Sequence, residues 1–473
     1  MEGLPEILDD LWPVVIVFVS MMALCWICSL YLTQKSMDTF LSVYFGGAAV
    51  WALKTLWDSG VLGKLLDTFG SLDDGSKYMC SVALIAVGYF LSGAFSSRSK
   101  LKEAGGGAES GKPISYPKSL SSDEKKAFVG ICDMLMEEVL EDMKETHEAI
   151  PEQVEWVKNM LEYNVKGGKM NRGMGVIDVQ QVFANQAGRN LSTVEVCRAS
   201  VLGWCIEWLQ AFFLVADDIM DGSITRRDKP CWYRVPSVKL IAINDSFILE
   251  SFVYQVLRRH FAGESYYLQL VELFHDCVFR TEMGQLLDLT SQPMDGPADL
   301  ARLFTMTRYK MIVKYKTAFY TFYLPCAIGM ITAGVKNPGA FSLARTICCA
   351  IGEFFQARAH RHAVQDDYLD CFGVDIGKVG TDIQDNKCSW LVVQALDRCD
   401  SAQRKVLVEN YGQDDPKKVL KVKELYKTLG LQKAYEEYEQ ESYETINNLI
   451  AQVTDVPREI YDKFINRIYK RTK

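Results

Sequence analysis

Two aspartate-rich clusters of the same form are the feature of this sequence that most constrains its structure. Each cluster has three aspartates within five residues: Asp217, Asp218 and Asp221 in the first, and Asp366, Asp367 and Asp370 in the second. In a helix, the first and last aspartates of a cluster lie on one face, and the middle one points about 100° away. Each cluster therefore predicts a pair of carboxylates presented together at a helix end.

The residues before the first cluster predict a buried helix. Residues 204–216 are apolar nearly all round, which is typical of a helix inside a core. Carboxylates at the C-terminal end of such a helix oppose its dipole, and like charges in a cleft are unfavourable unless cations compensate. Hard oxygen ligands beside phosphate groups favour Mg²⁺. The clusters together therefore predict a magnesium-dependent diphosphate site, whereas either cluster alone could be a solvated acidic helix end.

The first 95 residues predict a membrane-anchoring region. Residues 11–34 and 78–97 contain no charged residue, and each stretch is long enough to cross a hydrocarbon core of about 30 Å. Residues 39–57 form a third apolar stretch interrupted by Lys54, which could reach the interface with its long side chain. We expect two or three spans. The alternative is an unusually apolar helical domain without a membrane.

The charges around these stretches predict the orientation of the chain. The first ten residues carry acidic side chains and no Lys or Arg, unlike a secretory signal or a transit peptide. Arg98, Lys100 and Lys102 follow the last apolar stretch, and the positive-inside rule places such residues in the cytosol. We therefore expect a membrane-anchored protein, for example of the endoplasmic reticulum, whose C-terminal part faces the cytosol. With three spans the N-terminus would lie across the membrane from the cytosol, and with two spans it would lie in the cytosol.

Behind a flexible linker at residues 96–118, rich in Ser, Gly and Lys, residues 119–473 predict a single all-helical domain. Apolar residues recur there at spacings of three and four, Asp123 offers a helix cap, and prolines fall between the helical segments. The 14 cysteines lack a disulfide-framework spacing, which indicates a reducing compartment. A net charge of -8 argues against a nucleic-acid partner.

Basic residues gather near the aspartate clusters and suit phosphate groups. The loop at residues 167–173 combines glycines, which allow close backbone approach, with Lys169 and Arg172. Arg226 and Arg227 follow the first cluster closely. Further along the chain lie Lys316 beside Thr317, then Lys378 and Lys387. Each could be ordinary surface charge, but together with the carboxylate pairs they predict binding of more than one diphosphate.

At these residues the chain resembles the eukaryotic farnesyl diphosphate synthases of the trans-isoprenyl diphosphate synthase family. The resemblance covers about residues 127–473. It implies a large isoprenoid-synthase-type helix bundle, here preceded by the two or three membrane helices. It also implies condensation of isopentenyl diphosphate with dimethylallyl and geranyl diphosphates, for isoprenoid and sterol precursor biosynthesis, by a homodimer. Its most specific stretches are residues 167–173, 203–227, 281–289, 314–325, 365–372 and 377–394.

The resemblance assigns roles to individual residues. Asp217, Asp221 and Asp366, supported by Asp218, Asp367 and Asp370, are the implied ligands of three Mg²⁺ ions, for which Mn²⁺ is expected to substitute. Arg226, Lys316 and Lys378, with Lys387, are implied to bind the allylic diphosphate. Lys169, Arg172, Gln210, Arg227 and the C-terminal Arg471 are implied to bind isopentenyl diphosphate, and Thr317 and Tyr320 to lie near the developing carbocation. Gln356 is implied to contact substrate.

Phe212 and Phe213 lie one helical turn before the first cluster, where a growing product chain would point. Bulky rings at this depth are expected to stop elongation at farnesyl diphosphate. Plain core packing is the alternative interpretation of these rings.

The sequence departs from the family directly after Gln356. Residues 357–363 are added between Gln356 and the second aspartate cluster. Seven residues are nearly two helical turns, so a continuous helix would keep its face but shift the upstream segment by about 10 Å. That shift would move Gln356 away from the substrate and bring Ala363 into its place. A locally extended or bulged helix, or an incorrect gene model, would also account for the added residues.

Other functions remain open at this point. A longer-chain synthase, such as one that makes geranylgeranyl diphosphate, would use the same clusters. A terpene cyclase needs no second diphosphate site, so Lys169, Arg172 and Arg227 argue against it. A non-catalytic regulatory or scaffold subunit would bind diphosphate without turnover, although such a subunit would not need both clusters intact.

Overall fold

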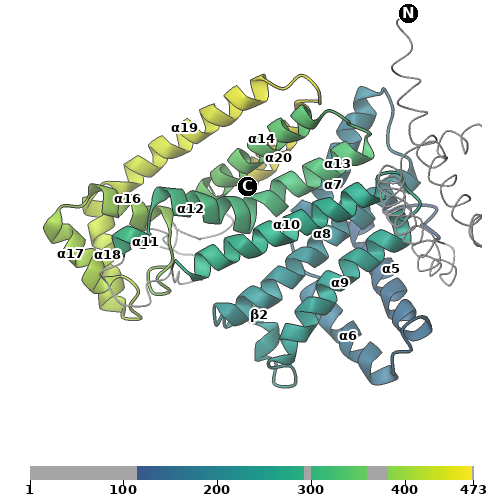
Figure 1. Ribbon diagram of the computed structural model, residues 1–473, viewed down its shortest axis with the longest axis horizontal. Coiled ribbons are helices and arrows are strands. Elements are labelled where there is room, and N and C mark those ends of the chain that lie inside the picture. The colour runs from purple at the N-terminus through teal and green to yellow at the C-terminus, as the bar shows by residue number, and fades with distance from the viewer. Residues whose placement is uncertain (1–113, 292–299, 359–381, 471–473) are drawn as a thin grey trace, which may run out of the picture. The chain divides into compact units, whose positions relative to one another are not determined.

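The computed structural model describes residues 114–291, 300–358 and 382–470, all within a compact unit that spans Gly111–Lys473 (Figure 1). The described residues are helical apart from loops and one short hairpin, which confirms the predicted all-helical domain. All three predicted membrane spans lie outside them. Among the described residues one helix, α8, is long and apolar enough to cross a membrane, and 78% of its most apolar window is buried inside the domain.

The first half of the domain contains the long helices that surround the site. They are α5 (Glu124–Glu145), α6 (Pro151–Asn164), α7 (Asn171–Gln186), α8 (Thr193–Met220), α9 (Ile241–Phe261) and α10 (Tyr267–Leu289). Between α8 and α9 lie the antiparallel strands β1 (Thr225–Arg226) and β2 (Lys229–Pro230), and the 3₁₀ turn η2 (Trp232–Arg234).

The second half begins with short segments and ends with long ones. Its elements are α11 (Leu300–Leu303), α12 (Met306–Ile312), the π-helix η4 (Val313–Tyr323), α13 (Leu324–Thr332), α14 (Pro338–Arg358), α16 (Trp390–Arg398), α17 (Ser401–Asn410), α18 (Pro416–Thr428), α19 (Leu431–Ala451) and α20 (Glu459–Lys470).

Local sequence explains where the main helices begin. The Asp123 side chain accepts a hydrogen bond of 2.9 Å from the backbone N–H of Lys126, so the predicted cap of α5 is confirmed. Helix α8 starts with a capping box in which Ser192 and Glu195 bond each other's backbone N–H groups. Its apolar run is buried as predicted, with Trp204 and Trp208 among the largest enclosed side chains.

Helix α8 lies at the centre of the bundle and packs against α5, α7 and α9 (Figure 1). The π-helix η4 lies between α10 and α14, and α13 continues its direction along α7. The main apolar core gathers around α8, and a second core that includes Trp390 and Tyr426 joins α16, α18 and the start of α19. The C-terminal end of α8 therefore emerges between α10, the hairpin and η4.

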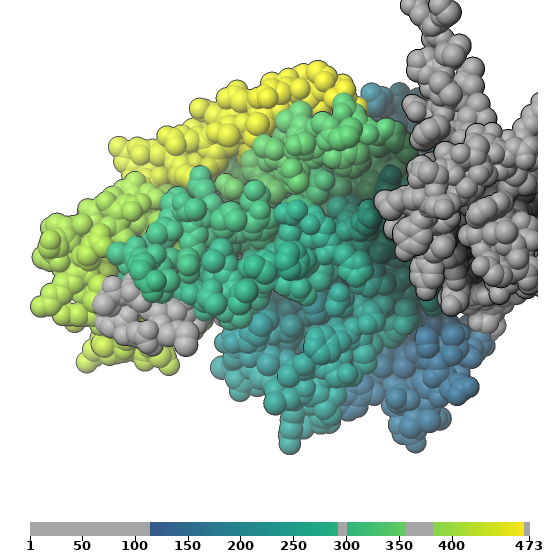
Figure 2. All heavy atoms as spheres, in the orientation of Figure 1, coloured from purple at the N-terminus to yellow at the C-terminus, as the bar shows by residue number. Residues whose placement is uncertain are grey.

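Helices α9 and α10, whose atoms are teal in Figure 2, carry several apolar side chains that are exposed. The two helices are antiparallel neighbours, and the rings of Tyr254 and His275 stack across them at 4.1 Å. We define the α9–α10 patch by its exposed members: Leu240, Ile241, Ile243, Phe247, Leu268, Phe279, Met283 and Leu286.

Candidate active site

A cavity of about 980 Å³ opens at the C-terminal end of α8. Its walls come from the loop before α7, the last three turns of α8, the hairpin, α10, η4 and Phe355 of α14. The cavity brings together most of the residues predicted from the sequence: Lys169, Arg172, Gln210, Phe212, Phe213, Asp217, Arg226, Arg227, Lys316, Thr317 and Tyr320.

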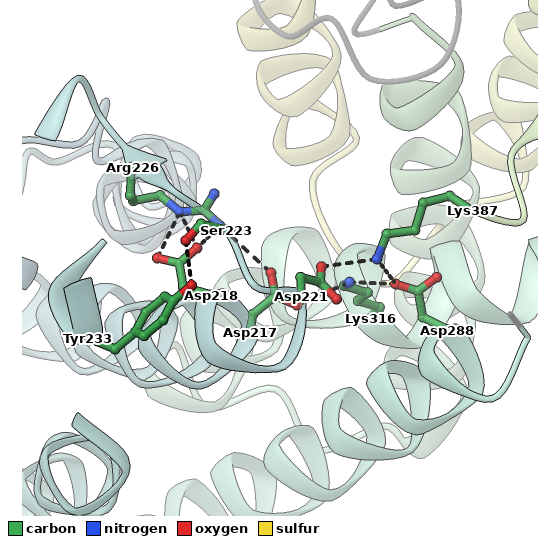
Figure 3. Close-up of polar contacts among 9 residues, drawn as sticks. All are labelled: Asp217, Asp218, Asp221, Ser223, Arg226, Tyr233, Asp288, Lys316 and Lys387. Atoms are coloured by element: carbon green, nitrogen blue, oxygen red, sulfur yellow. Dashed lines mark hydrogen bonds and ion pairs between the residues drawn. The ribbon is translucent and has the colours of Figure 1, made fainter. Parts of the chain in front are cut away.

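The first aspartate cluster divides as the helical spacing predicts. Asp217 and Asp221 both face the lysines of the site, whereas Asp218 points toward the hairpin (Figure 3). Asp218 is only 3% exposed, and the Arg226 guanidinium donates to it through Nε at 3.0 Å and through a terminal nitrogen. Asp218 thus holds Arg226 in place, and its support of a metal stays a prediction.

Two lysines and a third carboxylate form a network with Asp217 and Asp221 (Figure 3), and within this network Asp217 and Lys316 line the cavity. The Lys316 ammonium lies 3.2 Å from Asp217 Oδ1 and 2.7 Å from Asp288 Oδ2. The Lys387 ammonium lies 3.0 Å from Asp221 Oδ2 and 3.4 Å from the same Asp288 oxygen. Asp288 is therefore the shared partner of both lysines.

The burial of these groups and their mutual charges set their pKa values. Burial raises the pKa of Asp288, but Lys316 and Lys387 outweigh it and hold that pKa below its usual range. Burial lowers the pKa of Lys316, yet Asp288 and Asp217 raise it above the ordinary lysine value. Burial and the neighbouring Asp217 carboxylate raise the pKa of Asp221. The network therefore keeps both lysines charged, and it leaves Asp217 and Asp221 as mutually repelling carboxylates.

Sequence reasoning missed Asp288 and the π-helix that carries Lys316. Asp288 is an acid at the end of a mostly apolar helix, the same signal that marked the first cluster, but it is a single residue. Gly284 lies one turn before it, where a Cβ atom would overlap the Lys316 backbone nitrogen. Helix α10 and η4 therefore touch backbone to backbone, which brings Asp288 within reach of Lys316.

A second group of cations lines the cavity at the start of α7 and on the hairpin. Arg172 donates through Nε to Thr321 Oγ1 at 2.9 Å, and its guanidinium lies 4.7 Å from the centre of the Tyr320 ring. Arg227 donates to the backbone oxygens of Asn164 and Lys166 at 3.4 and 3.2 Å. Both guanidinium groups are therefore held in fixed positions, as the recognition of a phosphate group requires.

Aromatic rings also line the cavity. Phe212 and Phe213 have their ring centres 4.8 Å apart, and Phe213 meets Tyr320 edge to face at 5.5 Å. The cavity lining therefore combines apolar rings with a carboxylate–lysine group and an arginine–lysine group.

Several predicted residues lie outside the described part of the chain. These are Asp366, Asp367, Asp370, Lys378 and Arg471, together with the side chain of Gln356 and most of the added segment. Phe355, directly before Gln356, does line the cavity, and its ring meets Phe322 at 5.5 Å. Gly352 of the same helix packs directly on Ala318 of η4. Helix α14 therefore reaches the cavity at Phe355, while the shift of about 10 Å expected for Gln356 stays a prediction.

The described carboxylates fit a divalent metal. The buried Asp217 Oδ1 receives no hydrogen bond from the described residues, and its contact with Lys316 is an ion pair. Asp217 and Asp221 offer hard oxygen ligands on one helix face, and Mg²⁺ is commonly bound by one or two carboxylates together with substrate phosphates. Within the described ranges, no three acidic, histidine or cysteine side chains converge on one point. The third predicted ligand, Asp366, lies outside those ranges.

A helical domain with paired acids and clustered cations around one cavity defines a protein that binds phosphate-bearing molecules with a metal. The polyprenyl synthetase family matches residues 154–429, more than half of the chain. The chain belongs to the polyprenyl synthetase family.

Similar proteins extend the match beyond the family region. The farnesyl diphosphate synthase of Dictyostelium discoideum is 46% identical over 366 residues, which cover 76% of this chain and 92% of that protein. Farnesyl pyrophosphate synthase 2 of Arabidopsis thaliana is 44% identical, over 74% of this chain and all of that protein. A solved T. brucei farnesyl diphosphate synthase complexed with bisphosphonate has a TM-score of 0.66 and 34% identity, over 74% of this chain and all of that one. The described domain therefore has the isoprenoid synthase helix-bundle fold.

The turn that carries Arg227 generates a prediction about stability. Arg227 and Asp228 form the two-residue turn between β1 and β2, and their φ angles are 53° and 62°. Such a turn favours glycine, because side chains crowd the left-handed region. We expect Asp228→Gly to raise the free energy of unfolding by about 0.5–1 kcal/mol, measured by urea denaturation. Asp228→Ala should lower the free energy of unfolding. A rise for the alanine variant would contradict the inference that the backbone is strained at this position.

Proposed function

We propose that this protein is a farnesyl diphosphate synthase, which joins isopentenyl diphosphate to dimethylallyl diphosphate and then to geranyl diphosphate. The observation that carries the proposal is one cavity lined by a carboxylate–lysine group, an arginine–lysine group and aromatic rings. One charged group can hold the diphosphate that leaves and the other can hold the diphosphate that stays. The identity of about 45% to farnesyl diphosphate synthases supports the same reaction.

In the carboxylate–lysine group, Asp217 and Asp221 would hold Mg²⁺, and the resemblance adds Asp366 and a total of three ions. When bound, the metal withdraws charge from the departing diphosphate oxygens. Mn²⁺ is expected to replace Mg²⁺, because both prefer oxygen ligands. Burial and the repulsion from Asp217 raise the pKa of Asp221, and a bound cation would relieve that repulsion.

The chain's own cations perform the rest of this task. Lys316 and Arg226 line the cavity, and Asp288 and Asp218 hold their charged groups in position. Breaking the allylic C–O bond leaves the electron pair on diphosphate, so positive groups fixed beforehand stabilise the transition state. We assign the same role to Lys387, which shares Asp288, and by resemblance to Lys378.

In the arginine–lysine group, isopentenyl diphosphate would be bound by Lys169, Arg172 and Arg227, with Gln210 beside them. The resemblance adds Arg471 at the C-terminus, and Gln356. The double bond of isopentenyl diphosphate attacks the allylic carbocation to form the new C–C bond, and a proton is then lost to the departed diphosphate. The apolar wall formed by the phenylalanines keeps water from the cation, while Thr317 and Tyr320 lie where it develops.

An assay of the full chain tests this reaction. The purified protein is incubated with Mg²⁺, geranyl diphosphate and labelled isopentenyl diphosphate, and products are identified by chain length. We expect farnesyl diphosphate, loss of activity with a chelator, and recovery when Mg²⁺ is restored. Asp217→Asn should lower kcat by about 10²-fold or more, because charge on the leaving group is no longer balanced. The control is Asp397→Asn, which removes an exposed acid of α16. A well-folded protein that forms no product would refute the proposal.

The length of the product depends on the rings of the cavity wall. We expect Phe212→Ala combined with Phe213→Ala to give products longer than farnesyl diphosphate, because the wall beside the growing chain opens. Chromatography with mass detection measures the product lengths. Phe252→Ala is the matched control, since this buried ring packs on Trp208 and does not line the cavity. Unchanged farnesyl diphosphate from the double variant would remove the chain-length role.

We propose further that the protein is a homodimer that pairs through the α9–α10 patch. The stacked rings of Tyr254 and His275 lie on the helix faces that also carry Ile243, Phe247, Leu268, Phe279 and Leu286, so these exposed apolar side chains lie on one side of the helix pair. Contiguous exposed apolar surface of this kind is typical of interaction sites. The chemistry of the patch, which is apolar and shared by two helices of the same chain, suits a second copy of itself.

A charged residue in the α9–α10 patch should separate the subunits. We expect Phe279→Asp to convert the dimer to a monomer, because the carboxylate would be buried without a partner. Sedimentation of the purified full chain measures the mass. The control is Ile150→Asp, a comparable exposed apolar residue at the start of α6. A Phe279→Asp protein that stays dimeric would exclude this surface.

For the N-terminal region, we propose that residues 1–95 anchor the enzyme in a membrane such as the endoplasmic reticulum, and that residues 119–473 face the cytosol. The support is the uncharged length of residues 11–34 and 78–97 and the basic residues that follow them. In this arrangement the enzyme would take its substrates from water and release its lipophilic product beside a bilayer.

A further inference from the structure

Glu207 is a buried acid of α8 to which the sequence analysis gave no role. It is 7% exposed and lies one turn before Gln210, on the part of α8 that packs against the start of α7. A buried carboxylate is costly unless other groups compensate its charge. Its partners therefore indicate what the residue does.

The start of α7 has no helix cap from its own sequence. The N-cap residue is Met170, which has a left-handed φ of 57° and makes no side-chain cap hydrogen bond. The first N–H groups of a helix have no partner within that helix. Glu207 Oε1 accepts a hydrogen bond of 2.8 Å from the N–H of Gly173, the third residue of α7. A side chain of α8 thus makes the bond that Ser or Asp usually provides at an N-cap.

Close contact between the two helices makes this bond possible. A Cβ atom on Gly173 would lie 2.8 Å from the Gly203 carbonyl oxygen, and one on Gly203 would overlap Gly173 in turn. The helices therefore meet backbone to backbone one turn before Glu207. That contact fixes the carboxylate opposite the open end of α7.

The residues just before Gly173 belong to the arginine–lysine group of the cavity. Arg172 is the second residue of α7, next to the capped Gly173, and Lys169 lies just before the helix. Burial raises the pKa of Glu207, while the Gly173 N–H and the charges of Arg172 and Arg227 lower it. The carboxyl group is thus coupled both to the backbone of α7 and to the two arginines.

We propose that Glu207 is a positioning residue for isopentenyl diphosphate: by capping α7 from the neighbouring helix, it fixes Arg172 where the diphosphate binds. This inference rests on the proposed function. The assigned allylic site depends on other contacts: Lys316 pairs with Asp217 and Asp288, whereas the cap joins Glu207 to the start of α7. Loss of the cap should therefore weaken the binding of isopentenyl diphosphate and leave the binding of the allylic diphosphate unchanged.

Three variants of the full chain test the proposal. Glu207→Leu removes the acceptor and keeps the bulk, Glu207→Gln keeps an oxygen that can accept from Gly173, and Glu137→Gln removes an exposed charge of α5 as the control. Calorimetry measures the Kd of isopentenyl diphosphate and, with Mg²⁺, of geranyl diphosphate. The kinetic assay gives the KM for each substrate and kcat.

We expect Glu207→Leu to raise the Kd and KM of isopentenyl diphosphate about tenfold, which corresponds to about 1.4 kcal/mol. The values for geranyl diphosphate should stay within about twofold, and Glu207→Gln should stay within about threefold of the parent for both substrates. A purely structural role would lower the melting temperature without separating the substrates. Should Glu207→Leu not fold, Glu207→Ala removes the same acceptor.

Two outcomes would overturn the proposal: unchanged binding of isopentenyl diphosphate by the Leu or Ala variant, or an equal loss for both substrates. Failure of the proposed function is a separate result. If the parent protein binds both diphosphates and forms no product, the reaction is refuted, while the binding constants still decide the role of Glu207.

Discussion

The ion pairs that Lys316 makes with Asp217 and Asp288 decide how three elements of this domain meet. Each residue lies on a different element, α8, α10 or η4, and the three charges are largely withdrawn from water. Buried ion pairs contribute little to stability because desolvation offsets their attraction, but an unpaired buried charge is strongly unfavourable. The elements are therefore confined to the arrangement in which every charge keeps its partner, and that arrangement sets the shape of the cavity.

The same arrangement brings charged groups of both signs to one cavity. Carboxylates lie at the end of α8, arginines lie at the start of α7 and on the hairpin, and Phe212 and Phe213 lie about one turn before the carboxylates on α8. The cavity thus offers charged groups to phosphates and apolar rings to hydrocarbon. Two anionic substrates can then be held apart at their phosphates while their hydrocarbon parts meet at the rings.

Local rules were enough to predict the helical fold and most of the site. The spacing of Asp217, Asp218 and Asp221 predicts which two share a face, and the apolar run before them predicts a buried helix. The roles of Asp288 and Glu207 could not be predicted, because each is a single acid whose partner lies on a helix distant in sequence. The π-helical form of η4, which packs closely on Gly284 and Gly352, leaves no local signal in the sequence. The second aspartate cluster lies outside the described residues, so its geometry remains a prediction from sequence.

The π-helix has a consequence for how this segment tolerates change during evolution. A π-turn arises when one extra residue is accommodated inside a helix. The η4 helix is therefore wider than an α-helix, and its successive side chains point in different directions around the axis, which is its phase. Exchange of one side chain for another leaves that phase intact. Loss or gain of a residue would rotate Lys316 and Tyr320 relative to each other, and one of the two would leave the cavity wall. The length of η4 is therefore under tighter constraint than the identity of its outward-facing residues.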